Sequence, residues 1–193
     1  MNILLATQGS QGVVALRELF SGNFKPKSIH VSVCENGASG PLIEFIRYNQ
    51  ISYSSHKSGP HFTKWLFTAG EEYDVLLSIS WKYLFGEQVI EYFGGRAINF
   101  HPGILPNYKG CFSIPWSIIN QEYYVGFTYH YISKYFNEGN IVFQEKIKIG
   151  AVDTAHSLNY KVFQIGLSKL IDVISLIGTQ GNPQSTGGQY YPN

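Results

Sequence analysis

Residues 3–20 read ILLATQGSQGVVALRELF, in which a short apolar run ends at a small, polar turn and a helical pattern follows. The apolar run covers Ile3 to Thr7, and the turn is built around Gly9 and Ser10. Apolar residues then return at spacings of three and four, which is the period of an amphipathic helix. The stretch therefore predicts a strand, a tight turn and a helix, which is how an α/β fold commonly opens.

The same alternation of strand and helix patterns continues to residue 100. Further strands are expected at 28–34, 51–54, 74–80 and 96–100, and helices at 42–48, 61–69 and 87–93. Strands that alternate with helices favour a mostly parallel, doubly wound sheet, in which ligands gather at the carboxyl ends of the strands. The sequence therefore predicts a Rossmann-like α/β fold.

The pattern changes after residue 100, where prolines and glycines form a loop. The elements expected beyond this loop are a helix at 113–120, strands at 126–132 and 140–149, and one long helix from the Asp153-Thr154 start to Ile177. The two strands could pair with each other, so we expect an antiparallel extension of the sheet after residue 123. We also expect one catalytic domain over residues 1–178 and a surface tail over 179–193.

Composition excludes several classes of partner. The net charge is +1 and charged residues make up 14% of the chain, which predicts binding neither to nucleic acid nor to a membrane. The two cysteines, Cys34 and Cys111, lack metal-type spacing, so no metal is expected. The first residues lack the sections of a signal peptide, and we expect a cytoplasmic protein. The oligomeric state is left open, and a homodimer is one alternative.

The most informative stretch is NFHPGILPNYKG at residues 99–110, directly after an expected inner strand. Asn99 and His101 are two residues apart, so on extended backbone their side chains point the same way. An amide donor and a titratable imidazole then converge at the end of the sheet where a substrate is expected. Taken alone, this pair is equally well explained as a surface histidine beside a proline turn.

A second segment favours the catalytic interpretation of Asn99 and His101 over the surface histidine. It reads GFTYHY at residues 126–131 and is followed by NEGNI at residues 137–141. Together with the loop at 99–110 and the Gly9-Ser10 turn, these motifs resemble the formyltransferase superfamily, which uses N10-formyltetrahydrofolate. The resemblance spans most of the chain and is closest to the sugar N-formyltransferases. It implies the formyltransferase version of the Rossmann-like fold and a one-carbon transferase activity.

The resemblance also implies three catalytic positions. Asn99 matches the amide that steadies the oxyanion, and His101 matches the imidazole that assists it and handles protons. The third position is an aspartate in the family pattern, but this chain has Asn137. Donors act most strongly where charge develops, and a carboxylate beside the imidazole would favour its charged form. Asn137 can hydrogen-bond but cannot supply negative charge.

Three explanations of Asn137 stay open at this point. The chain is a weakened or inactivated enzyme, the adjacent Glu138 replaces the missing charge, or the protein binds its ligands without turnover. Adjacent residues normally project in different directions, which makes Glu138 an awkward substitute.

The resemblance further implies residues for the two substrates. For the folate co-substrate it indicates a loop and a facing residue, namely Ser80, Trp81, Lys82, Tyr83, Leu84 and Phe136. For the formyl acceptor we expect Gly9, Ser10, Tyr108, Lys109, Trp116, Tyr129 and Tyr131. Gly9 and Ser10 open a helix, whose free N–H groups can hold a phosphate. The tyrosines and Trp116 offer stacking faces, although ordinary packing explains them equally well.

The acceptor amine is expected to belong to a nucleotide-linked amino sugar, because residues 108–118 look like the sugar N-formyltransferases. Two alternatives are kept. One is an enzyme like glycinamide ribonucleotide formyltransferase, and the other is a non-catalytic folate or nucleotide-sugar binding protein.

Overall fold

A computed structural model of the chain describes residues 1–185 and 187–191. Residues 186, 192 and 193 of the expected surface tail lie outside the described residues. The chain forms two compact units, residues 1–99 and residues 100–193, and each is described by itself below. The expectation of a single catalytic domain over residues 1–178 stays a prediction.

The first unit alternates strands and helices along its whole length. Its elements are β1 (Asn2–Thr7), α1 (Gly9–Phe20), β2 (Ser28–Cys34), a 3₁₀ turn (Glu35–Gly37), α2 (Gly40–Tyr48), β3 (Ser52–His56), α3 (Gly59–Thr68), β4 (Val75–Ile79), α4 (Glu87–Phe93) and the start of β5 (Ala97–His101). β1 pairs in parallel with both β2 and β4, and β2 pairs in parallel with β3. The predicted parallel α/β arrangement is therefore confirmed.

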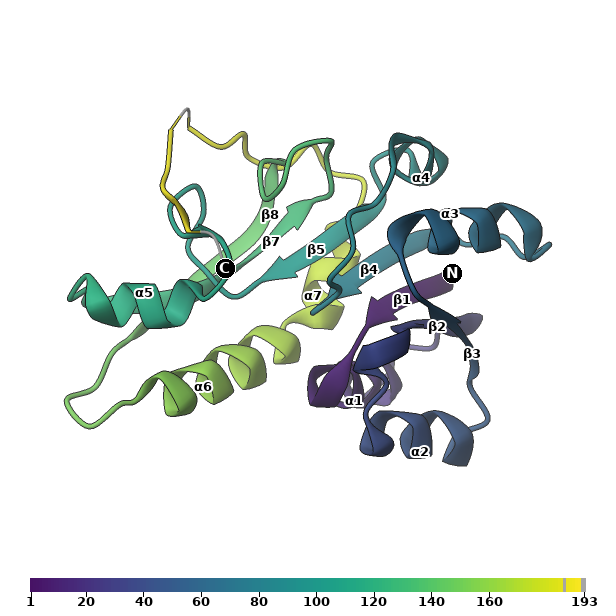
Figure 1. The fold of residues 1–193 in the computed structure, drawn as a ribbon, viewed down its shortest axis with the longest axis horizontal. Coiled ribbons are helices and arrows are strands. Elements are labelled where there is room, and N and C mark those ends of the chain that lie inside the picture. The colour runs from purple at the N-terminus through teal and green to yellow at the C-terminus, as the bar shows by residue number, and fades with distance from the viewer. Residues whose placement is uncertain (186, 192–193) are drawn as a thin grey trace. The chain divides into compact units, whose positions relative to one another are not determined.

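Both faces of the parallel sheet in the first unit are covered by helices. α1 and α2 lie on one side of β1, β2 and β3, and α3 lies on the other side (Figure 1). β4 is buried along its whole length, as expected for a strand covered on both faces. α3 begins where Ser58 Oγ accepts a hydrogen bond from the His61 amide, and Pro60 follows directly after the first helical residue.

The second unit begins within β5 and carries the antiparallel part of the sheet. Its elements are β6 (Lys109–Gly110), α5 (Ser113–Ile119), β7 (Tyr124–Tyr131), β8 (Ile141–Lys148), α6 (Ala155–Ser168), α7 (Leu170–Ser175) and β9 (Tyr190–Tyr191). β7 lies between β5 and β8 and pairs with β8 in antiparallel fashion. Because β7 begins at Tyr124, the predicted antiparallel extension after residue 123 is confirmed. α5 and α6 both pack against β7 and lie on the same side of it (Figure 1).

One predicted element was wrong, because the long helix from residue 153 to residue 177 is two helices. Thr154 caps the start of α6 as predicted, in a reciprocal arrangement with Ser157. The backbone N–H of Lys169 donates a hydrogen bond to the carbonyl oxygen of Gly166, three residues earlier, with an N···O distance of 3.2 Å. This tighter turn ends α6 at Ser168, and α7 begins at Leu170. A continuous apolar pattern does not reveal such an interruption.

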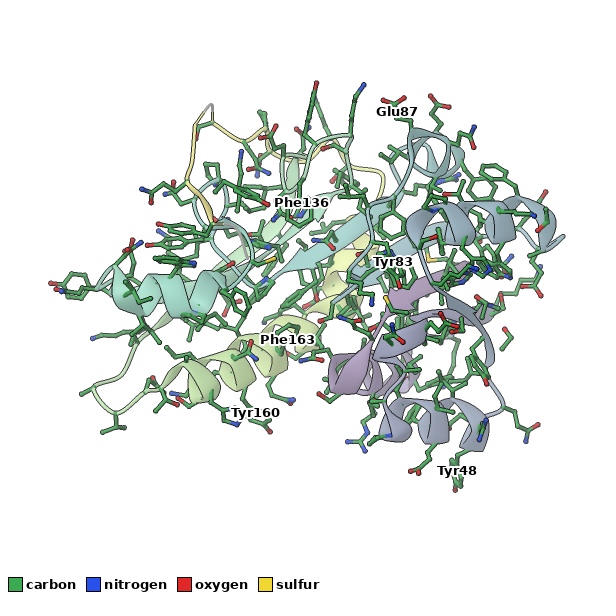
Figure 2. The ribbon with its side chains drawn as sticks, viewed as in Figure 1. Tyr48, Tyr83, Glu87, Phe136, Tyr160 and Phe163 are labelled. Carbon is green, nitrogen blue, oxygen red and sulfur yellow. The ribbon has the colours of Figure 1, made fainter. Side chains whose placement is uncertain are left out.

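The closest packing in the core of the second unit surrounds Gly166 on α6. A Cβ at this position would lie 2.4 Å from Phe100 and 3.1 Å from Phe127. Phe100 also contacts Phe163 on α6, with ring centroids 5.1 Å apart, and Figure 2 labels Phe163 there. Glycine is therefore required here by space and not by backbone conformation.

We predict that Gly166→Ala lowers the free energy of unfolding by about 1–3 kcal/mol, because the added methyl group must displace packed aromatic rings. Denaturant titration of both proteins measures this difference. Gly40→Ala is the matched control, since a Cβ at Gly40 meets nothing within 4 Å. Equal stability of the Gly166→Ala variant and the parent chain would contradict the tight packing.

Candidate active site

β5 carries both predicted catalytic side chains near its end. Asn99 and His101 are two residues apart on this strand, so both side chains leave it on the same face. Ser78 on β4 donates a hydrogen bond from Oγ to Asn99 Oδ1 over 2.8 Å. Because this contact uses the carbonyl end of the amide, the NH₂ group of Asn99 faces away from Ser78. The arrangement leaves Asn99 oriented as a donor, as an oxyanion requires.

His101 is buried, and the structure brings it together with Asn137. Its Nε2 lies 2.7 Å from the carbonyl oxygen of Tyr108, and its Nδ1 lies 3.4 Å from Asn137 Nδ2. A carbonyl oxygen only accepts, so Nε2 carries the proton and donates to Tyr108. Nδ1 then holds the lone pair of a neutral ring and accepts from the Asn137 amide. The contacts of His101 therefore specify one tautomer.

The protonation state of His101 follows from its surroundings. Burial lowers its pKa from 6.5 to about 4, the Tyr108 carbonyl opposes this, and His130 nearby lowers the pKa further. No carboxylate is among these causes. The ring is therefore neutral at pH 7, and the charged imidazole that the family pattern favours is not formed with asparagine at position 137.

The structure adds His130 to this cluster, a residue that the sequence analysis quoted but gave no role. His130 is 3% exposed, and its Nδ1 donates to the Tyr131 carbonyl over 2.9 Å. Its side chain also hydrogen-bonds to Asn137, and burial lowers its pKa to about 4. Asn137 thus contacts two neutral imidazoles. The seven-residue spacing between His130 and Asn137 was the available signal, but spacing alone does not show that both face one point.

The loop that follows His101 is held in place by small and hydroxyl side chains. A Cβ at Gly103 would lie 2.6 Å from His101 Nε2, so only glycine fits there. Ser113 at the start of α5 donates from Oγ to the Tyr108 carbonyl over 3.1 Å. Thr128 on β7 donates to the Gly103 carbonyl over 2.7 Å and accepts from the Leu105 amide over 3.2 Å. These contacts explain the glycine and threonine of the two motifs.

Glu138 is directed toward a lysine. Its Oε1 accepts from Lys109 Nζ over 2.9 Å, and its side chain is 47% exposed. Of these two adjacent residues, it is Asn137 whose side chain contacts His101. Glu138 therefore does not replace the missing charge beside His101. Lys109, which was expected to contact the acceptor, is paired with Glu138.

The expected stacking faces of Tyr108 and Trp116 are both covered by Tyr191 from the tail. The ring centroids of Tyr191 and Tyr108 are 5.2 Å apart with nearly parallel planes, and those of Tyr191 and Trp116 are 4.8 Å apart. The Tyr108 hydroxyl donates to Glu122 over 2.6 Å, and burial together with this contact raises the pKa of Tyr108 to about 12. Tyr191 therefore occupies one stacking face of each ring.

The two remaining tyrosines of the expected acceptor set have structural contacts. Tyr129 is 1% exposed, and its hydroxyl donates to the Gly166 carbonyl over 2.9 Å. The structure places it in the core, and its expected contact with the acceptor stays a prediction. Tyr131 is half-buried and donates from its hydroxyl to the Thr179 carbonyl over 2.6 Å. Tyr131 therefore helps to hold the tail.

In the first unit, the loop expected to hold the folate is an aromatic cluster. Trp81 stacks on Phe85 with ring planes 10° apart, and Lys82 lies 5.0 Å from the centre of the Tyr83 ring. Ser80 has a positive φ of 59°, which turns the chain sharply at the end of β4. Leu84 is exposed, as is Phe136 in the turn after β7, which Figure 2 labels. The folate-binding roles of these residues stay predictions.

The predicted phosphate turn in the first unit has the expected local shape. α1 begins at Gly9, which has a positive φ of 64°, and no side chain caps the helix start. Ser10 is exposed in the first turn of the helix. Free N–H groups at a helix start suit an anion, but this role also stays a prediction.

In residues 1–185 and 187–191, no group of three or more His, Cys, Asp or Glu side chains could hold a metal ion. In the same part of the chain, none of the helices combines the length and the apolar character that crossing a membrane requires.

Comparison with known proteins supports the resemblance. Residues 48–174 match the model of the formyl transferase family. GDP-perosamine N-formyltransferase of Brucella melitensis is 33% identical over 117 residues, which cover 61% of this chain and 45% of that protein. Methionyl-tRNA formyltransferase of Alkaliphilus oremlandii is 30% identical over 104 residues, which cover 54% and 34%. The matched region thus spans less than half the length of these relatives.

Solved structures share the fold at low sequence identity. Phosphoribosylglycinamide formyltransferase from Bacillus halodurans has a TM-score of 0.79 at 19% identity, with 93% of this chain and 96% of that chain covered. The N-formyltransferase from Helicobacter canadensis, solved with folinic acid and dTDP-3-aminofucose, has a TM-score of 0.77 at 21% identity, with 99% and 70% covered. Two kinds of formyltransferase therefore share the architecture.

Proposed function

Because the chain belongs to the formyl transferase family, we propose that it transfers a formyl group from N10-formyltetrahydrofolate to the amine of a nucleotide-linked amino sugar. The observation that carries this proposal is the contact between His101 and the side chain at position 137. His101 lies two residues after Asn99 on β5. This contact between residues 36 positions apart in the sequence supports the proposal.

In this proposal the chain's own residues have distinct tasks. The acceptor amine attacks the formyl carbon, and negative charge develops on the formyl oxygen. The Asn99 amide donates a hydrogen bond to that oxygen, and the amide itself neither gains nor loses a proton. His101 is a second donor through its Nε2–H, which the Tyr108 carbonyl accepts in this structure, so the formyl oxygen must replace that acceptor. The tetrahedral intermediate then collapses, so that the bond from the formyl carbon to N10 breaks, the proton of the attacking amine passes to N10, and tetrahydrofolate leaves. In this chain His101 Nδ1 faces an amide in place of a carboxylate, so no charged imidazole assists this proton transfer.

A sugar acceptor is favoured by the relative at 33% identity, whose name specifies a GDP-linked amino sugar. Gly9 and Ser10 are proposed to bind phosphate, and Ser80–Leu84 with Phe136 the folate. We place the protein in the cytosol and keep a homodimer as an expectation. Tyr108, Trp116 and Lys109 are proposed to contact the acceptor, beside Tyr191, which stacks on both rings, and Glu138, which pairs with Lys109.

A binding protein without turnover is the second candidate, and Asn137 is the observation that favours it. The neutral imidazoles of His101 and His130 give the amine proton no charged relay. A protein of this kind would hold both ligands and release neither formyl product nor tetrahydrofolate.

We predict slow release of tetrahydrofolate when the chain is incubated with N10-formyltetrahydrofolate and a nucleotide-linked amino sugar. The panel of acceptors contains GDP-, dTDP- and UDP-linked amino sugars and glycinamide ribonucleotide, and absorbance of the folate product measures turnover. Turnover with glycinamide ribonucleotide alone would overturn the sugar assignment. Tight binding of both ligands without turnover, in the Asn137→Asp variant as well, would establish the binding protein.

A further inference from the structure

The turn that carries Asn137 has an unusual backbone. Asn137 adopts a left-handed conformation with φ of 57°, which asparagine tolerates better than most residues. Two residues later, a Cβ at Gly139 would lie 1.8 Å from the Tyr131 carbonyl oxygen. The turn is therefore pressed against the end of β7, and its geometry determines where the Asn137 side chain points.

The side chain of Gln184, which lies in the tail, bridges the two ends of this turn. Gln184 Nε2 donates to the Asn137 carbonyl over 3.0 Å and to the Gly139 carbonyl over 2.8 Å. Gln184 Oε1 is buried and has no hydrogen-bond partner among the described residues. Turning the amide over would bring this oxygen against two carbonyl oxygens, so the two N–H bonds decide its orientation. A single amide nitrogen thus ties both ends of the turn together.

The tail segment that brings Gln184 to the turn is itself anchored to β7 and β8. Asn182 exchanges two backbone hydrogen bonds with Ile141, over 2.7 and 2.8 Å. Asn140 Nδ2 donates to the Gln180 carbonyl over 3.0 Å, and the Tyr131 hydroxyl donates to the Thr179 carbonyl. The tail residues that make these contacts follow residue 174, where the match to the family model ends. These hydrogen bonds hold residues 179–182 against the end of β7 and the start of β8.

We infer that Gln184 is a positioning residue, which holds the 137–139 turn so that the side chain at position 137 faces His101. Without its two N–H bonds, both carbonyls lose their donor and the left-handed residue can relax toward a commoner conformation. The side chain at 137 would then leave Nδ1 of His101. The geometric part of this inference stands on the contacts alone, and only its effect on catalysis rests on the proposed function.

The geometric part is tested by NMR on the chain as it is. The Asn137 side-chain amide hydrogens are buried beside His101, so they should exchange slowly with solvent. In Gln184→Ala we expect this exchange to accelerate at least tenfold and the His101 Nδ1 resonance to shift as its donor is lost. Gln184→Glu should show the same changes, because a carboxylate fills similar space but cannot donate.

Gln180→Ala is the matched control, because Gln180 contacts Asn140 through its backbone carbonyl, which the substitution keeps. Circular dichroism confirms that each variant is folded. Parent-like exchange in Gln184→Ala or in Gln184→Glu would overturn the inference. Equal acceleration in Gln180→Ala would also overturn it, since the effect would then come from general loosening of the tail.

The catalytic part is tested in the Asn137→Asp background. There Gln184→Ala should lower kcat by about ten- to a hundredfold with KM changed less than twofold, because misplacement of a catalytic group by about 1 Å costs up to about a hundredfold. Unchanged kcat in an active background would overturn the catalytic part of the inference. If no variant is active but the NMR changes occur, the positioning role stands and the proposed function fails.

Discussion

Replacement of Asn137 by aspartate is expected to raise formyl transfer by about a thousandfold or more. The new carboxylate accepts from His101 Nδ1 in place of the present amide donor, so it favours the charged ring and raises the pKa of His101 above its present value of about 4. In the serine-protease triad the opposite exchange costs about 10⁴-fold, which indicates the scale. Asparagine and aspartate have nearly the same shape and both tolerate a positive φ, so the turn is retained.

Two measurements check this prediction together. Tetrahydrofolate release gives the change in rate, and an NMR titration of the His101 ring gives the change in its pKa. Asn23→Asp is the matched control, because it makes the same exchange at an exposed side chain remote in sequence from position 137. A higher pKa without faster transfer would show that the missing carboxylate is not what limits this protein.

The free energy of unfolding is expected to fall by several kcal/mol when the pH is lowered from 7 to 4. Burial lowers the pKa of four histidines to about 4, and these are His30, His56, His101 and His130. In the unfolded chain the same rings have a pKa near 6.5, so below that pH the unfolded state binds more protons than the folded state. The stability is therefore complete above pH 6.5 and is lost as the pH falls toward 4.

A fall in the pKa from 6.5 to about 4 corresponds to about 3 kcal/mol of unfolding free energy for one fully titrated histidine. The contributions of the four histidines need not add. His56 illustrates the cause, since it is fully buried among Ser32, Ser54 and Trp65. Denaturant titrations at a series of pH values measure the loss. His56→Gln should flatten the profile, whereas the exposed His156→Gln should leave it unchanged. Constant stability between pH 7 and 4 would contradict the buried, neutral rings.

Much of the fold was predictable because it depends on local patterns. The apolar run at β4 and the Thr154 cap of α6 can each be recognised within a few residues. The break between α6 and α7 was not predictable, since the apolar spacing continues through Lys169. The pairing of β6 with β9 was also missed, because two-residue strands contain too few residues to show a pattern.

The residues of the candidate site were predictable only where they occupy a position of a recognised motif. Asn99, His101 and Asn137 could be singled out, and so could the departure from aspartate. Tyr129 was assigned to the acceptor because aromatic residues look alike in a sequence whether they pack in a core or face a ligand. The role of Gln184 had no signal, since a glutamine in a polar tail has no periodicity or motif.

By itself, the sequence determined most of the order of strands and helices, the family motifs and the residue type at position 137. These properties depend on residues close together in the chain. The tertiary structure alone decided that Asn137 contacts both His101 and His130, that burial keeps those rings neutral, that Glu138 pairs with Lys109, and that Gln184 and Tyr191 return from the tail. Burial and contact join residues far apart in the chain, and they depend on how all the intervening elements pack.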